Sequence, residues 1–142
     1  MKVHGVALLA ALLLAGCNAV ERGAAMLSRS TFVNDDLRDG NFSGRNLAGA
    51  NFSGARMDGA NFARANLSGA NLTSAGGVRG IFAGTDLSKA DLTNASFNEA
   101  MMQGANLNGA IIANARFPGA NLSGAIWTDG RVCGPNSIGE CR

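Results

Sequence analysis

Residues 67–88 read "LSGANLTSAGGVRGIFAGTDLS", and this stretch contains both the regular pattern of the chain and its one interruption. Large apolar residues recur at every fifth position, which we call the centre of a unit. The centres are Leu37, Phe42, Leu47, Phe52, Met57, Phe62, Leu67, Leu72, Phe82, Leu87, Leu92, Phe97, Met102, Leu107, Ile112, Phe117, Leu122 and Trp127. Gly77 is the only small residue among the nineteen centres. A step of five fits neither the helical period of 3.6 nor the strand period of two.

Each unit also carries the chemistry of a tight turn. Gly or Asn occupies the second position after the centre in twelve of the nineteen units. A type II turn needs a positive φ at its second central residue and favours proline at its first. Pro118 and Gly119 stand in those two positions. The pattern therefore predicts a short extended piece and a turn in each unit, with four units closing one square layer of twenty residues.

The polar positions complete a recognisable array. Asn or Asp precedes the centre in eleven of the nineteen units, and Ala stands two residues before it in most units. This A-(N/D)-(L/F)-x-x array resembles the pentapeptide-repeat family over about residues 35–129. The resemblance implies an all-β fold, a right-handed quadrilateral parallel β-helix, here of about five coils. It places the centre and the small residue two before it inside the coil, and the other three positions outside.

The twenty-residue period aligns residues of one kind along the predicted rod. The phenylalanines Phe42, Phe62 and Phe82 fall in one stack and the leucines Leu47, Leu67, Leu87 and Leu107 in another. Gly77 falls between Met57 and Phe97, where its missing side chain would leave a void. We expect either that Met57 and Phe97 lean into this void or that a bulge turns Val78 inward. The bulge is favoured, because the neighbouring glycines give the backbone freedom.

The first sixteen residues have the features of an export signal. Lys2 precedes the apolar run GVALLAALLLAG, which is shorter than the ~20 residues that a membrane-spanning helix needs. The run ends in LAGC, which looks like a bacterial lipobox. Residues 1–16 are therefore predicted to be a lipoprotein signal peptide, and Cys17 to be lipidated and anchored in the membrane. A soluble signal peptide and a buried apolar helix are the alternatives. Asn18 favours the outer membrane, facing the periplasm.

Two cysteines remain beyond Cys17, and both lie near the C-terminus. In an oxidising compartment Cys133 and Cys141 are expected to form a disulfide that closes a short loop. A metal site is the alternative, but His partners and CxxC spacing are missing. The predicted organisation is a signal peptide (1–16), a lipidated tether and N-terminal cap (17–34), the β-helix (35–129) and a C-terminal cap with the disulfide loop (130–142).

The residues needed for common catalytic sites are missing from the predicted mature chain. The only histidine of the whole chain, His4, lies in the predicted signal peptide, so the mature chain has none. This excludes a Ser-His-Asp triad and the usual zinc ligands. Asp35 with Asp36, and Asp86 with Asp91, form carboxylate pairs, but we favour a role in turn hydrogen bonds over acid–base catalysis. We expect no enzymatic activity, no catalytic residue, no cofactor and no metal.

The charge balance limits the class of partner. Residues 17–142 contain eleven Lys and Arg, the twelve of the whole chain less Lys2, against ten Asp and Glu. Some members of the resembled family mimic DNA and bind gyrase, which needs a strongly acidic surface. The near-neutral balance argues against such mimicry and against nucleic-acid binding. We expect an envelope scaffold that binds an unknown protein or envelope partner. A gyrase-binding, quinolone-resistance-like DNA mimic and a self-associating spacer, joined as a homo-oligomer through the solenoid ends, are the alternatives.

Charged residues gather on one side of the predicted rod. Thirteen occupy outward positions between residues 36 and 129, and eight of these share one side, which we call the charged face: Asp36, Arg38, Asp39, Arg56, Asp58, Arg79, Glu99 and Arg116. We expect either a recognition surface or solvated pairs, such as Asp36 with Arg56, each contributing little. A second candidate contact surface is apolar, with Ile81 and Met101 in one outward stack and Ile111 and Ile126 on other sides.

Overall fold

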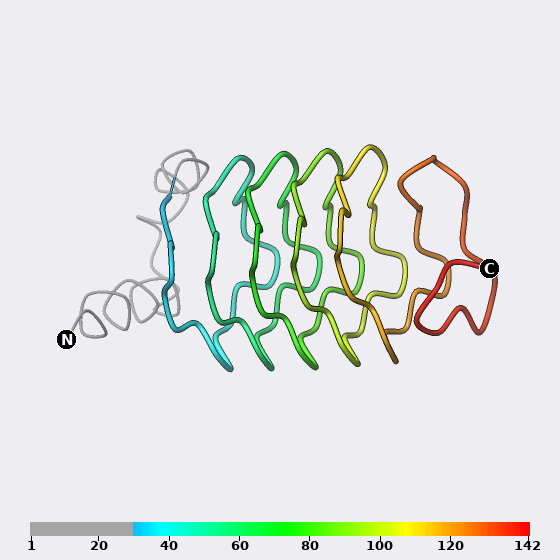
Figure 1. The fold of residues 1–142 in the computed structure, drawn as a ribbon, viewed down its shortest axis with the longest axis horizontal. Helices are drawn as coiled ribbons and strands as arrows, with labels where there is room; N and C mark the ends of the chain where they lie inside the picture. The colour runs from blue at the N-terminus through cyan, green and yellow to red at the C-terminus, as the bar shows by residue number, and fades with distance from the viewer. Residues whose placement is uncertain (1–29) are drawn as a thin grey trace.

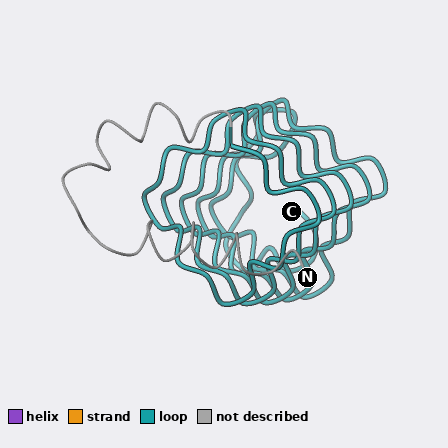
Figure 2. Ribbon diagram, turned by 90° about the vertical axis from the view of Figure 1, so that its left-hand side faces the viewer, coloured by secondary structure: helices purple, strands orange, loops and turns teal. Residues whose placement is uncertain are grey.

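The structure is a computed structural model that describes residues 30–142. The predicted signal peptide, the predicted lipidation site Cys17 and most of the predicted tether lie outside the described residues. Residues 30–142 form a rod of stacked coils, with the C-terminal residues at one end (Figure 1). Viewed from the end, successive coils superpose (Figure 2). The rod therefore has four long sides and two ends.

Backbone pairing follows the twenty-residue period. Parallel bridges join each residue that precedes a centre to the residue twenty positions later, from Thr31–Asn51 to Asn106–Ile126. The Leu67 N–H donates to the Asp86 carbonyl at 2.7 Å, and the Asp86 N–H donates to the Ala65 carbonyl at 3.0 Å. These bridges are isolated, and residues 30–142 contain no helix and no longer strand. Each side is short because a turn follows every bridging residue.

The turn prediction is confirmed. In each unit the centre accepts a hydrogen bond from the N–H three residues later, as Leu47 does from Ala50 at 3.0 Å. The second residue after the centre has a positive φ in every unit from Asn34 to Gly124. The first of these units has Phe32 at its centre, within residues 17–34, the predicted tether and cap. Gly119 has a φ of 72° directly after Pro118, as a type II turn requires. Residues other than Gly and Asn adopt the same conformation, including Arg64 and Lys89. The repeat therefore imposes the turn even where the local residue does not favour it.

The core consists of the centres and the small residues two positions before them. Leu67, Leu87 and Leu107 are fully buried, as are most of the intervening alanines. The rings of Phe42 and Phe62 stack with centroids 4.7 Å apart, and those of Phe62 and Phe82 stack at 5.3 Å. Thr85 replaces Ala in one inner position, and its hydroxyl donates to the Phe62 carbonyl at 2.7 Å. The predicted stacking by residue type is thus confirmed.

The favoured expectation for Gly77, a bulge with Val78 turned inward, is wrong. Gly77 keeps the regular pairing, since its N–H donates to the Ser96 carbonyl at 2.7 Å, and Val78 stays at its turn position, only half-buried. A Cβ on Gly77 would lie 2.9 Å from the Phe97 ring and 3.2 Å from the Phe82 ring. Aromatic carbons therefore occupy the space of the missing side chain. Rotating one ring costs less than breaking the backbone ladder of a coil.

The C-terminal cap covers part of the last coil. A disulfide joins Cys133 to Cys141, as predicted. Val132 and Ile138 form antiparallel bridges with Ile126 and Asn121, so two segments of the cap pair with two sides of the last coil. Ser137 is fully buried, and its hydroxyl donates to the Gly134 carbonyl at 2.9 Å, which closes the loop from inside.

Candidate interaction face

The structure gathers the eight predicted residues on one side of the rod. Seven of them are exposed, and Asp58 is half-buried. They lie in three columns because three positions of each unit point outward. One column starts at Asp36 and continues through Arg56, since these two residues form a parallel bridge. The predicted grouping follows from the twenty-residue ladder.

Asp36 pairs within its own turn, not with the coil above. The Arg38 guanidinium donates to both carboxylate oxygens of Asp36, at 2.8 and 2.6 Å. This hydrogen bond lowers the pKa of Asp36 to about 2, and the more distant charge of Arg56 adds least to the shift. The expected ion pair between Asp36 and Arg56 is not formed. Because Asp36 and Arg38 are both solvent-exposed, their ion pair contributes little to stability.

Asp58 has a structural role that follows from the interruption at residues 76–77. In most units the Asn or Asp before the centre accepts a hydrogen bond from the N–H two residues later, as Asn61 does from Ala63 at 3.0 Å. Gly76 has no side chain to do this. The Val78 N–H instead donates to Asp58 Oδ1 of the preceding coil at 3.1 Å. The Asp58 carboxylate therefore already has a hydrogen-bond partner within the protein.

Asn98 occupies the equivalent position two coils further along, where it finds no such donor. The residue that follows it by twenty is Pro118, which has no N–H. Asn98 Oδ1 is buried without a hydrogen-bond partner. Pro118 thus explains one of the two unsatisfied buried side-chain atoms in residues 30–142.

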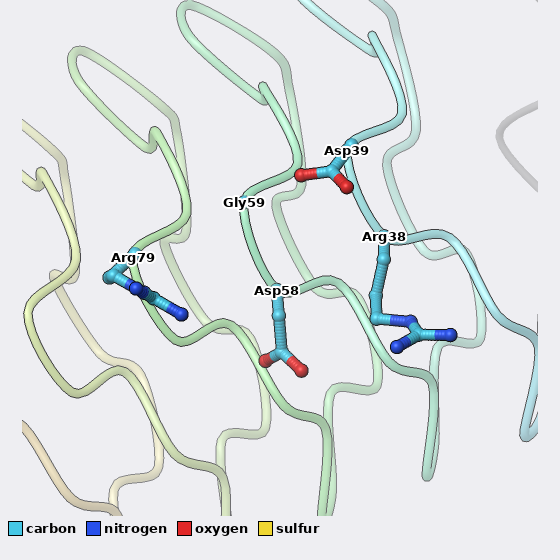
Figure 3. A pocket seen from close by; sticks show the side chains of 5 residues that line it. All are labelled: Arg38, Asp39, Asp58, Gly59 and Arg79. Atoms are coloured by element: carbon cyan, nitrogen blue, oxygen red, sulfur yellow. The ribbon is translucent and has the colours of Figure 1, made fainter.

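A shallow hollow of about 310 Å³ lies on the charged face, lined by Arg38, Asp39, Asp58, Gly59 and Arg79. Figure 3 shows the Asp58 carboxylate between Arg79 and Arg38. Asp39 and Arg79 both occupy the second position after a centre, where φ is positive, and their side chains line the hollow. Within residues 30–142, Arg79 forms no ion pair or side-chain hydrogen bond. Both basic and acidic side chains line the hollow. It therefore suits a polar partner that carries charges of both signs better than an apolar ligand.

Asp86 and Asp91, one of the two carboxylate pairs of the sequence, take part in turns. Asp86 accepts the Ser88 N–H at 3.0 Å, and Asp91 accepts both the N–H and the hydroxyl of Thr93, at 2.9 and 2.6 Å. Burial raises the pKa of Asp35. In the part of the chain that the structure describes, no three His, Cys, Asp or Glu side chains come together as a metal site would require.

Of the four predicted apolar residues, Met101 and Ile111 are exposed, whereas Ile81 and Ile126 are only partly exposed. Ile81, Met101, Asn121 and Ile138 follow one another through bridges along one side. Met101, Ile111, Val132 and Ile138 are exposed by 45, 54, 67 and 50%. Val132 and Ile138 were not predicted, because they lie in the cap, outside the five-residue pattern. Four of the five large exposed apolar residues described here thus lie in the C-terminal half of the rod, and Val33 is the fifth.

The family model for pentapeptide repeats matches residues 36–74, 82–112 and 90–126 with eight copies. The chain is a pentapeptide repeat protein. Residues 75–81, which contain Gly76 and Gly77, lie outside the matched ranges. This is the same stretch in which Phe97 and Asp58 replace the usual side chains. The structure shows that the repeat continues through it without a change of register.

Two solved structures of pentapeptide repeat proteins are similar to this one. HetL, which is involved in heterocyst differentiation regulation in the cyanobacterium Nostoc sp. strain PCC 7120, matches with a TM-score of 0.73 and 34% identity. The match covers 75% of this chain and 50% of HetL, so the chain spans about half the length of HetL. A protein of the Arabidopsis thaliana thylakoid lumen matches with a TM-score of 0.67 and 32% identity, covering 71% of this chain and 70% of that one. The fold is therefore the right-handed quadrilateral β-helix of the family.

No curated protein sequence matches the chain significantly. Among residues 30–142, no helix has the length and hydrophobicity needed to cross a bilayer.

Proposed function

We propose that this pentapeptide repeat protein is a membrane-anchored lipoprotein and a non-enzymatic scaffold of the bacterial cell envelope. Its rigid rod of about five coils presents a side to a protein or envelope partner. The buried disulfide between Cys133 and Cys141 carries this proposal, because such bonds persist in oxidising compartments outside the cytoplasm. The LAGC sequence before residue 18 supports lipidation of Cys17. Exposure to the periplasm from the outer membrane accords with both features.

The charged face is the surface proposed to bind the partner. Asp36, Arg38 and Asp58 have internal partners. Asp39, Arg56, Arg79, Glu99 and Arg116 form no ion pair or side-chain hydrogen bond with another described residue. These five free charges lie on one rigid side, so a partner with matching charges would meet them without reorganising the backbone. Directional contacts of this kind give specificity and faster association more than raw affinity.

The competing function is DNA mimicry directed at gyrase. A mimic of that type needs a strongly acidic surface, whereas residues 17–142 carry eleven basic and ten acidic residues. Of the five free charges on the charged face, three are arginines. The envelope scaffold is therefore the function that the charges support better.

Lipidation tests the anchor. Cells that express the wild-type protein are labelled with a palmitate analogue, and their membranes are separated from the soluble fraction. We expect label and protein together in the membrane fraction, and both lost from it in Cys17→Ser. An unlabelled cytosolic wild-type protein would refute the proposal and favour the DNA mimic.

Crosslinking in intact cells tests the surface. A photoreactive residue at Arg79 is compared with one at Ser68, an outward position on another side of the rod. We expect a specific adduct from position 79 alone. Equal capture from both positions would refute the charged face as the binding surface while leaving the anchor unaffected.

A further inference from the structure

The two ends of a solenoid expose backbone groups that no further coil covers, and the C-terminal end does so on only two of its four sides. On two sides the cap satisfies the last coil: the Leu122 N–H donates to the Ser137 carbonyl, and the Trp127 N–H to the Arg131 carbonyl, both at 2.8 Å. The Gly139 and Cys133 N–H groups donate back, to Ala120 and Ala125, also at 2.8 Å. We call these the covered sides.

The other two sides, formed by residues 110–119, are open. The N–H groups of Ile112 and Phe117 and the carbonyls of Ala110 and Ala115 have no hydrogen-bond partner within residues 30–142. In every lower coil the equivalent groups are paired with the coil above. Burial falls as well: Ile112 is only partly buried, whereas Leu92 below it is fully buried. The open sides therefore expose both a strand edge and part of the core, a combination that favours edge-to-edge pairing.

The cap has a free edge of the complementary kind. The N–H and carbonyl of Val132, and those of Ile138, form no hydrogen bond, because the neighbouring residues make the contacts to the coil below. In the ordinary ladder of this protein one residue donates its N–H and accepts with its own carbonyl, as Ile111 does with Ala90 and Leu92. Val132 and Ile138 each present that same pair of groups, pointing away from their own coil.

A two-fold axis brings the two free edges together in register. If the axis lies perpendicular to the rod, along the line between the covered and the open sides, it moves each cap onto the open sides of the other copy. After this rotation, the chain of the second copy goes around the rod axis in the opposite direction to the chain of the first copy. Within each copy, the cap segments are antiparallel to the coil on which they lie. The two reversals make the cap parallel to the open sides, which is the direction that the ladder of this fold requires.

We propose that a second copy of this chain occupies the open sides, so that two rods join end to end through their C-terminal caps. Val132 of each copy pairs beside Ile111 of the other, and Ile138 pairs beside Arg116. Ile111, Val132 and Ile138 are exposed by 54, 67 and 50% in the single chain, and this arrangement places each of them beside a side chain of the other copy. The interface is isologous, which is the usual geometry of dimers. The interface does not depend on the lipid anchor, and it meets the charged face only at Arg116.

Charge exchange across the predicted pair tests the interface. The full chain, purified as the cell makes it, is studied by sedimentation velocity over a range of concentrations. Ile111→Lys and Val132→Asp are each expected to weaken self-association about tenfold or more, because each replaces an apolar contact between the copies by a charge that has no partner. The double variant Ile111→Lys/Val132→Asp places opposite charges side by side in both copies and should recover most of the affinity. Ser43→Lys, an exposed change far from the C-terminal end, should have no effect.

Crosslinking identifies the register. Isotopically light and heavy copies are mixed, and a photoreactive residue replaces Ile111. The expected adduct joins position 111 of one copy to residues 131–133 of the other. A monomeric wild-type protein at high concentration, a double variant no better than the single ones, adducts between two copies of position 111, or an adduct with a different protein would each overturn the proposal.

Discussion

Gly77 and Phe97 show how a single residue is accommodated in a periodic core. The backbone ladder is unchanged at Gly77, and the Phe97 ring lies within 2.9 Å of where a Cβ on Gly77 would be. A ring can rotate about its side-chain bonds, whereas a coil held by hydrogen bonds above and below cannot shift alone. The irregular residue is Gly77, but the side chain that fills the space beside it, Phe97, lies twenty residues later in the sequence.

Gly77→Ala is therefore expected to destabilise the protein by about 1–3 kcal/mol, because the new methyl group overlaps the Phe97 ring. Thermal unfolding followed by circular dichroism measures this change. Gly76→Ala is the matched control, since its Cβ would lie 3.3 Å from Asp58 Oδ1, which a side chain can relieve. Adding Phe97→Leu to Gly77→Ala should recover part of the loss. Equal effects of the two alanine variants would contradict this account.

Asp36 gives the pH dependence expected at the residue scale. Its folded pKa is about 2, below the ordinary value of 3.8. Because the pKa of Asp36 is lower in the folded state, its ionised form stabilises the protein at pH values above the unfolded pKa. This contribution is lost as the pH falls from 3.8 towards 2. Carboxyl chemical shifts in an NMR titration should give a midpoint near 2 for Asp36. Arg38→Ala should move that midpoint upward, and an unchanged midpoint would show that the pair is not the cause.

The repeating element is a bridging residue followed by a type II turn. Its second turn position has a positive φ in every unit from Asn34 to Gly124. Glycine adopts this conformation without strain, while a side chain with a Cβ costs free energy there. All units therefore have the same backbone shape but differ in stability. Backbone strain is expected in the units with Arg, Lys or Glu at the second turn position.

Lys89→Gly should stabilise the protein by up to about 1 kcal/mol, because it relieves a φ of 58° at a non-glycine residue. Ser88→Gly, one position earlier in the same turn, has no positive φ to relieve and should destabilise by about 0.5–1 kcal/mol. Denaturant unfolding of both variants checks the opposite signs. A destabilised Lys89→Gly would mean that the Lys89 side chain contributes more than the turn geometry costs.

At the scale of the whole molecule, stability is a sum over coils that contact only their neighbours. The ends then decide how the rod frays. The C-terminal end is held by the cap, which the Cys133–Cys141 disulfide closes and which covers two of the four sides. A rod of this kind should open from an end inward.

Removing the disulfide with Cys133→Ser/Cys141→Ser should cost about 2–3 kcal/mol through loop entropy. Hydrogen exchange should show where the loss falls. We expect reduced protection at the N–H groups of Leu122, Gly124 and Trp127, which donate to the cap. Protection at Leu67, in the middle of the rod, should be retained. Uniform loss along the chain would show that the rod unfolds as one unit.

The amino-acid sequence by itself determined the parts of this protein that repeat. The five-residue step, the turn position, the inner stacks, the grouping of the charged face and the disulfide could all be predicted, because each depends on residue type at a fixed spacing. The tertiary structure alone decided what fills the space at Gly77, that Asp36 pairs with Arg38, and that Asp58 holds the Val78 N–H. It also decided which sides of the last coil the cap leaves open. These outcomes depend on side-chain rotamers and on contacts between neighbouring coils, where several partners compete for one group and only packing selects among them.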